Sequence, residues 1–407
     1  MTTVNGDAGV SGHRWVNEAL LDDPQGLEEA DPGMMLRALA SAGAQVRESM
    51  ALTAEADLSS LSEEGRPRAV VIAGVGTAAR TGDVLATVAG PRCPVPVLSH
   101  RSAGVPGWVG AGDVVIAVSA SGRSPEALAA AAAAARRGAR LVAVGAPNSE
   151  LAALAERARA VFVPVPRRAP ARASLWALTV PVLLAARALG MIRLAEADLV
   201  ETAARLDREA ERCRPSAESF VNPAKSLALN LANSIPVIWG SSPLAAVAAR
   251  RFADTLSTNS RYPAVAGSLG EAGRGRVGLL DGVYGGLAES ERDIFADPEE
   301  GQNEITRLRL IILRDDGMDD EEARLSGGEP AAVEARRAAA VAELAERRGV
   351  RCTVVAAEGV SPLERLASLI AVPDFASVYL AIAHGFDPMA VPAVTEMKEL
   401  SMPRLPG

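Results

Sequence analysis

Cysteine, lysine, histidine and aromatic residues are all scarce in this chain of 407 residues. The three cysteines, Cys93, Cys213 and Cys352, lie far apart, without the spacing of a metal site or of a disulfide framework. Such cysteine usage is typical of a reducing compartment, so we expect a cytoplasmic protein without a bound metal or another cofactor. Because only 3% of the residues are aromatic, the core must consist mainly of alanine, valine and leucine.

An uninterrupted apolar run of membrane-spanning length and an excess of positive charge are also missing. The most apolar segment, 173–186, contains Pro181 and is shorter than the roughly 20 residues that span a bilayer, so we expect a buried helix and no membrane contact. The N-terminus lacks a basic start followed by an apolar run, so we expect no signal peptide. The net charge of −8 argues against a protein that coats nucleic acid. A small anionic ligand held by local dipoles remains compatible with this charge.

The most informative stretch is 113–128, DVVIAVSASGRSPEAL. Its first six residues predict a buried strand, and the alanine-rich run that begins at Pro125 predicts a helix. The loop between them brings Ser119, Ser121, Gly122 and Ser124 to the N-terminus of that helix, an arrangement that attracts phosphate without a basic side chain. An ordinary strand-to-helix turn uses the same residue types, so the loop alone leaves both interpretations open.

Strands and helices alternate along most of the chain, which predicts parallel sheets covered by helices on both faces. The unit of a strand, a Gly/Ser/Thr turn and a helix occurs first at 69–88 and again at 235–256. We therefore expect an α/β protein with two three-layer αβα sandwiches. Further strands are expected in the segments 95–99, 141–144, 161–163, 277–280, 308–313 and 352–356.

Several segments together resemble the sugar isomerase (SIS) domain, and in particular the two-SIS family of bifunctional phosphoglucose/phosphomannose isomerases, including its divergent actinobacterial branch. The segments are GVGTAARTGDVL (74–85), SASGRSPEAL (119–128), RASLWALTVPVLL (172–184), NPAKSLALNLANSIPVIWGSSPLA (222–245) and LERLASLIAVPDFASVYLAIAHGFDPMAV (363–391). The resemblance implies two flavodoxin-like SIS domains, at 61–195 and 196–386, between a helical N-terminal extension (1–60) and a C-terminal tail (387–407). It also implies a homodimer with active sites near the subunit interface.

The resemblance further implies that the substrate is a hexose phosphate. Its phosphate would be held by the serine loop, with Ser119, Ser121, Gly122 and Ser124, and by the glycine loop, with Gly76 and Thr77. The family uses a glutamate and a histidine for proton transfer, and Thr258 and Arg274 stand at those positions here. Neither side chain acts as a general base near neutral pH, so we expect both to bind substrate instead.

Three other residues are candidates for the proton transfers of aldose–ketose isomerisation. Glu271 lies near the expected site, although a surface carboxylate is the simpler interpretation. His384 ends an apolar helix, where histidine more often caps carbonyl groups. Lys398 matches a basic residue of the family, and a solvated tail charge is the alternative. Two functions stay open: a sugar-phosphate isomerase with relocated catalytic groups, and a SIS pseudoenzyme that senses or presents a sugar phosphate.

Overall fold

The computed structural model describes residues 16–63, 65–289, 306–316 and 331–401. A first parallel sheet contains five strands in the order β2-β1-β3-β4-β5. Their bounds are β1 Val70–Ala73, β2 Val97–His100, β3 Val114–Ser119, β4 Arg140–Gly145 and β5 Val161–Pro164. This is the flavodoxin-like order. β2 is added on one side of β1, and β3, β4 and β5 are added on the other side, so the strand order reverses between β1 and β3.

Alternating side chains of this sheet enter two different cores. Val71, Val115 and Ala143 face a small outer core with α6 (Pro125–Arg136) and α7 (Glu150–Arg157). Ile72 and Ile116 face the large inner core, together with α5 (Thr77–Ala89) and α8 (Leu175–Ala188). The sheet is therefore the middle layer of a three-layer sandwich, as predicted.

The second parallel sheet has the order β7-β6-β8-β9 and repeats the same topology with four strands. Their bounds are β6 Ser234–Gly240, β7 Val265–Ser268, β8 Arg307–Arg314 and β9 Cys352–Ala356. Trp239 and Ile312 pack outward with α12 (Leu269–Ala272) and α14 (Ala331–Arg347), whereas Ile311 faces the inner core with α11 (Pro243–Thr255). The predicted fold of two αβα sandwiches is thus confirmed, while the exact domain boundaries remain predictions.

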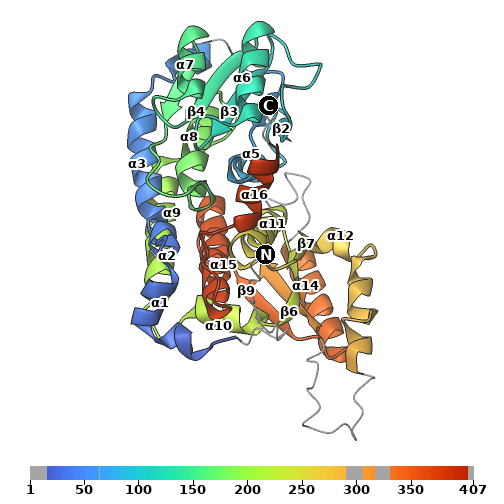
Figure 1. Cartoon of the computed structure of the whole chain (residues 1–407). Helices are drawn as coiled ribbons and strands as arrows, with labels where there is room; N and C mark the ends of the chain where they lie inside the picture. The colour runs from blue at the N-terminus through green and yellow to red at the C-terminus, as the bar shows by residue number, and fades with distance from the viewer. Residues whose placement is uncertain (1–15, 64, 290–305, 317–330, 402–407) are drawn as a thin grey trace, which may run out of the picture.

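The remaining helices come from both ends and from the middle of the chain (Figure 1). The N-terminal part contributes η1 (Ala19–Asp22), α1 (Pro24–Ala30), α2 (Met35–Ala40), α3 (Ala42–Glu55) and α4 (Ser59–Glu63). The others are η2 (Ala171–Ala173), α9 (Glu196–Arg212), α10 (Pro223–Leu231), α15 (Pro362–Ala383) and α16 (Pro392–Ser401). In Figure 1, α3 and α9 form a column beside α15.

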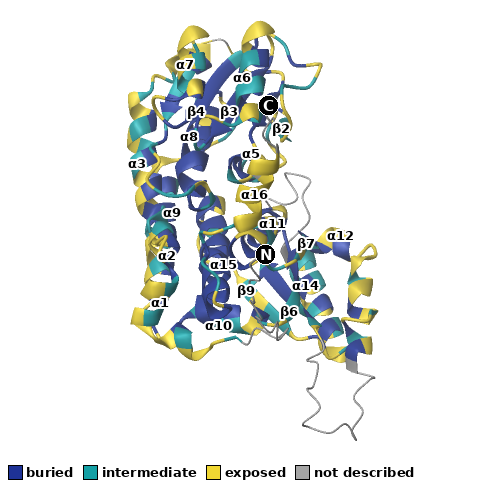
Figure 2. Cartoon of the chain, viewed as in Figure 1, coloured by how far each residue is buried: buried dark blue, intermediate teal, exposed yellow. Residues whose placement is uncertain are grey.

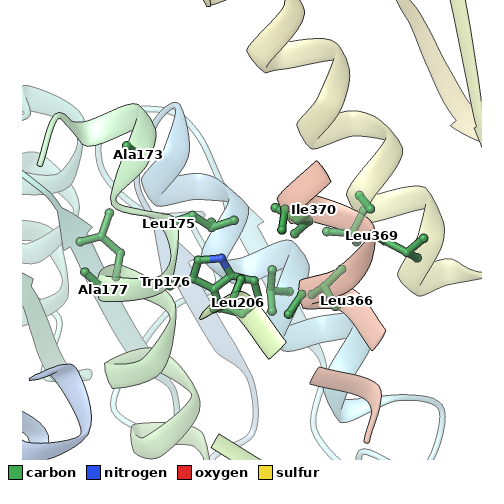
Figure 3. Packing of buried hydrophobic residues seen from close by; sticks show 14 of the residues in the cluster. Ala173, Leu175, Trp176, Ala177, Leu206, Leu366, Leu369 and Ile370 are labelled. Atoms are coloured by element: carbon green, nitrogen blue, oxygen red, sulfur yellow. The ribbon is translucent and has the colours of Figure 1, made fainter. Parts of the chain in front are cut away.

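Helix α15 is the centre of the molecule and is buried along almost its whole length (Figure 2). It is long and apolar enough to cross a membrane by length and composition alone, yet its most apolar window is entirely buried inside the protein. Leu366, Leu369 and Ile370 of α15 lie in one cluster with Trp176 of α8 and Leu206 of α9 (Figure 3). The structure therefore gives this apolar helix the role of a core element.

Two parts of the second half differ from the expectation. The segment 277–280, predicted as a strand, lies in a 3-10 helix (η4, Arg276–Asp281), so that prediction is wrong. The place beside β6 is taken by β7, and the glycines at 275, 278 and 282 interrupt the apolar run that resembled a strand. The predicted C-terminal tail contains helix α16, and most of the acidic loops expected at 289–304 and 315–329 lie outside the described residues.

Candidate active site

The candidate site lies at the point where the strand order of the first sheet reverses, between the carboxyl ends of β1 and β3. These strands pair in parallel, with Ala73 opposite Ala117, so the glycine loop and the serine loop leave the same edge of the sheet side by side. In open α/β sheets this is the crevice where ligands bind. Helices α5 and α6 begin at these loops, and the N-cap side chain of neither helix accepts a hydrogen bond from the backbone of its first turn.

The serine loop is ordered by its own hydroxyl groups. The Oγ atoms of Ser119 and Ser121 are 3.5 Å apart, and the Ser121 hydroxyl accepts a hydrogen bond from the Arg123 N–H at 3.2 Å. Ser124 occupies the N-cap position of α6, but its hydroxyl donates to the Glu126 carboxylate at 2.8 Å. The Glu126 backbone N–H and this hydroxyl lower the pKa of the Glu126 carboxyl group. A carboxylate therefore already lies at the N-terminus of α6, which shows that this position attracts an anion.

Gly122 is required by the fold of this loop. Its φ is +66°, and a Cβ atom at this position would lie 2.0 Å from the Ser149 Oγ. The Gly122 carbonyl accepts a hydrogen bond from Leu151 N at 3.0 Å, so the loop is fixed against the start of α7. Gly76 has a φ of +59°, but open space surrounds its Cα, so the glycine loop is less tightly enclosed. The structure thus brings the two predicted phosphate loops together on a rigid support.

Arg80 connects this region to the second half of the chain. It lies one turn after Thr77 on α5, and its Nε donates to Asp254 Oδ2 of α11 at 2.7 Å. Its Nη1 also donates to Asp83 at 2.8 Å. Although burial favours the neutral form, the ion pairs with Asp254 and Asp83 raise the pKa of Arg80. The start of α5 and the end of α11 are therefore held together by a charged, mostly buried clamp.

Thr258 lies next to this clamp in a π-helical turn (η3, Leu256–Ser260) that continues α11. Its hydroxyl donates to the Asp254 carbonyl at 2.8 Å, one turn earlier. The next residue, Asn259, is buried and donates to the Ser377 hydroxyl of α15 at 2.9 Å. π-Helical turns are frequent at functional sites, and this one holds Thr258 one turn after Asp254, the partner of Arg80 on α5.

Arg172 is a site residue that the sequence analysis quoted within a motif but did not single out. Its guanidinium donates to the backbone carbonyls of Thr258, Pro388 and Met389 and to the Asn259 side chain, at 3.0–3.3 Å. Burial lowers the pKa of Arg172, against the opposing field of Asp387. The arginine thus joins the π-helical turn to the segment after α15, which only the tertiary structure reveals.

Asp254 was also missed, because an aspartate near the end of an alanine-rich helix resembles an ordinary surface charge. In the structure its side chain is 45% exposed and is held by Arg80, whose own side chain is only 10% exposed. The other carboxylate in this cluster, Asp83, is 14% exposed and is bound by Arg80, Arg101 and Ser99. Asp254 therefore combines solvent access with a fixed position beside α5.

Glu271 and Arg274 lie on the loop that contains α12. The Glu271 side chain is 69% exposed, and it pairs with Arg276 at a distance of 3.8 Å. Burial lowers the pKa of Arg250 on α11, and the negative charges of Asp83 and Glu271 oppose this shift. Arg274 is exposed. Both side chains are therefore exposed and lie outside the buried part of the cluster.

His384 and Lys398 occupy different surroundings. His384 is 9% exposed, ends α15, and its Nε2 lies 2.5 Å from the Tyr262 hydroxyl, which also accepts a hydrogen bond from Asn233 N. The structure therefore gives the imidazole a half-buried phenol partner. Lys398 is a residue of α16. No group of three or more potential metal ligands occurs among the described residues.

Comparison with known proteins agrees with this architecture. Residues 220–400 match the family model of the bacterial phospho-glucose isomerase C-terminal SIS domain. The chain is 27% identical over 335 residues to a bifunctional phosphoglucose/phosphomannose isomerase of Caldicellulosiruptor bescii, an alignment that covers 81% of this chain and 88% of that protein.

Solved structures with the same fold share little sequence with this chain. A hypothetical protein from Thermus thermophilus has a TM-score of 0.66 at 16% identity, covering 95% of this chain and 96% of its own. The C-terminal domain of glucosamine-fructose-6-phosphate aminotransferase from Francisella tularensis has a TM-score of 0.56 at 13% identity, covering 86% and 96%. At these identities the likeness concerns the fold alone.

Proposed function

Because this chain belongs to the two-SIS family of bifunctional phosphoglucose/phosphomannose isomerases, we propose that it binds a hexose 6-phosphate and interconverts its aldose and ketose forms. The observation that carries the proposal is the crevice between β1 and β3, where the serine loop, the glycine loop and two helix N-termini converge. Ser119, Ser121, Thr77 and the backbone N–H groups of both loops hold the phosphate in this proposal.

Isomerisation requires a base that takes the proton from C2 of the aldose and returns it to C1. We propose the Asp254 carboxylate for this step, because it lies beside the first turn of α5 and is half exposed. The Arg80 guanidinium next to it stabilises the negative enediolate that forms between the two transfers. Thr258 and Arg274 remain predicted contacts to the sugar hydroxyl groups, and Glu271, His384 and Lys398 remain predicted proton-transfer groups.

The test is a coupled assay with fructose 6-phosphate that follows glucose 6-phosphate and mannose 6-phosphate separately. With Asp254 as the base, Asp254→Asn should lower kcat by at least about a hundredfold, and Asp254→Glu should recover part of the loss. Glu271→Gln should retain activity. If Glu271→Gln is the inactive variant instead, the base is Glu271. If the wild type binds the sugar phosphate in a thermal-shift titration but never turns it over, the chain is a sensor and not an isomerase.

We also propose that the protein acts in the cytoplasm as a homodimer. Three apolar side chains of α16 support an interface with a second copy, since Val394, Met397 and Leu400 recur every third residue and are 42%, 60% and 81% exposed. Light scattering after gel filtration tests the dimer. A mass of twice the chain would agree with it, and Leu400→Glu should then shift the mass toward the monomer.

A further inference from the structure

The second sheet has a crevice of the same kind as the candidate site, between the carboxyl ends of β6 and β8. Gly240 at the end of β6 pairs with Leu313 of β8, so the loops that follow these strands leave the sheet next to each other. Ser241 and Ser242 form the first loop and begin α11, a helix of 13 residues. Asp315 forms the second loop. By topology this is the place where a repeated phosphate site would lie.

The Asp315 carboxylate fills this crevice. Its Oδ2 accepts a hydrogen bond from the Ser242 hydroxyl at 2.7 Å, and its Oδ1 accepts one from Arg365 Nε of α15 at 2.8 Å. The Asp315 backbone N–H donates to the Ser241 hydroxyl at 2.8 Å. The Asp315 carboxylate is only 6% exposed and the Arg365 side chain 12% exposed.

This set of donors is what a bound phosphate would require. It combines a hydroxyl group at the N-terminus of a helix with the planar guanidinium of an arginine, both directed at one pair of carboxylate oxygens. In the first half, the corresponding strand β3 ends in Ser119, and the carboxylate at that crevice, Glu126, accepts a hydrogen bond from the Ser124 hydroxyl of its own loop. The two crevices therefore differ in how the carboxylate is held, because Asp315 is buried and paired with an arginine, whereas Glu126 is partly exposed and bonded to a hydroxyl group of its own loop.

We propose that the Asp315 carboxylate is a permanent internal ligand of the second crevice, standing where a phosphate group would bind, so that each chain has one sugar-phosphate site. The number of one sugar-phosphate site per chain rests on the proposed function of the first half, whereas the role of Asp315 does not. The internal ligand fixes the start of α11, whose other end carries Asp254. The second half thereby acts as a rigid support for the site in the first half.

The first experiment removes the internal ligand. Asp315→Ala leaves the Ser242 hydroxyl and the Arg365 guanidinium facing a hole, which formate or inorganic phosphate would fill. At constant ionic strength, about 100 mM formate or phosphate should raise the melting temperature of this variant by about 3–6 °C relative to chloride. The wild type and the matched control Asp316→Ala, at an exposed position that pairs with Arg314, should show no rise with formate, and with phosphate only the rise that the proposed site in the first half gives to all three proteins. A folded Asp315→Ala variant without anion rescue would overturn the proposal.

The second experiment does not depend on a variant that folds. Calorimetric titration of the wild type with fructose 6-phosphate should give one site per chain, and two sites per chain would overturn the proposal. If no site is found, the proposed function of the first half is wrong, and so is the proposed number of one sugar-phosphate site per chain. The formate and phosphate experiment then decides separately whether Asp315 is an internal ligand.

Discussion

At the scale of single residues, the ion pair between Arg251 and Asp374 is the most consequential buried interaction. Arg251 Nη2 and Asp374 Oδ2 are 2.9 Å apart, Arg251 Nε donates to the other oxygen at 3.1 Å, and the side chains are 4% and 9% exposed. Removing one partner leaves a buried charge without compensation, so Asp374→Leu alone should lower the free energy of unfolding by about 3–5 kcal/mol.

The double variant Arg251→Met/Asp374→Leu separates charge from packing. Because neither charge remains, it should recover most of the lost stability in urea unfolding. The exposed pair Arg47–Asp207, with side chains 53% and 46% exposed, provides the control, and its removal should change stability by about 1 kcal/mol or less. If the double variant is as unstable as Asp374→Leu, the loss of stability does not come from an unpaired buried charge. The ion pair itself then stabilises the fold.

The cysteines provide a second prediction, which depends on pH. Burial raises the pKa of Cys213 to about 12 and that of Cys352 to about 11. Only the thiolate reacts, so at pH 8 iodoacetamide should modify Cys213 roughly a thousandfold and Cys352 roughly a hundredfold more slowly than in urea. Mass spectrometry of digests taken over time measures both rates. Equal rates in native buffer and in urea would contradict the burial of these thiols.

The raised pKa values of the thiols also determine whether the free energy of unfolding rises or falls with pH. A thiol whose pKa is raised in the folded state binds its proton more tightly there. Below pH 9.0, the ordinary pKa of a cysteine, the thiol is protonated in both states, so the fold keeps its full free energy of unfolding. As the pH rises from there toward 12, the unfolded chain loses the proton first. Cys213 should therefore cost about 1.4 kcal/mol of stability for each pH unit in this window.

Which site residues could be foreseen depends on the range of the interactions that define them. Ser119 and Gly122 were found because a strand, a loop and a helix start are local patterns. Arg80 and Asp254 lie 174 residues apart, and their pairing arises only when α5 packs against α11. Arg172 contacts backbone carbonyls, which have no signature in a sequence, so its connecting role was not foreseen.

At the scale of elements, the serine loop should be sensitive to one added methyl group. Gly122→Ala combines a φ of +66° with a Cβ only 2.0 Å from Ser149 Oγ, so the loop must move away from α7. We expect an affinity for fructose 6-phosphate at least about tenfold weaker, which corresponds to about 1.4 kcal/mol. Titration calorimetry measures this change.

Gly138→Ala is the matched control for that substitution. Gly138 has nearly the same φ, +68°, but nothing lies within 4 Å of an added Cβ, so the variant should lose only about 1 kcal/mol of stability and bind normally. Comparable binding by the two variants would argue that the serine loop does not hold the phosphate.

The elements themselves were predictable where the local pattern was strong. The buried runs that became β1, β3, β6 and β8 were predicted as strands because they are short and apolar. β7 was missed because its sequence, VAGS, is short and contains glycine, and the helix α16 was missed within a segment rich in proline. The π-helical turn depends on the tertiary contact between Asn259 and Ser377, which local propensity does not contain.

At the scale of the whole molecule, the inner core is continuous. Ile72 and Ile116 of the first sheet belong to the same cluster as Ile311 of the second, through the helices between them. Two sheets that share one core should not unfold independently, so calorimetry should record a single transition.

A variant sharpens that prediction. Asp374→Leu on α15 should shift the entire transition to lower temperature without splitting it, because α15 packs against α9, α10 and α11 alike. Two separate peaks, of which only one moves, would mean that the two sheets are independent folding units.

The position of α15 in the chain also has a consequence during synthesis. Helices α9, α10 and α11 leave the ribosome long before Ala383, the last residue of the helix around which they pack. At the usual speeds of translation, the interval between Glu196 and Ala383 is roughly 10–40 s, during which their apolar faces have no central partner. The nascent chain is therefore expected to require a chaperone until its final helix has emerged.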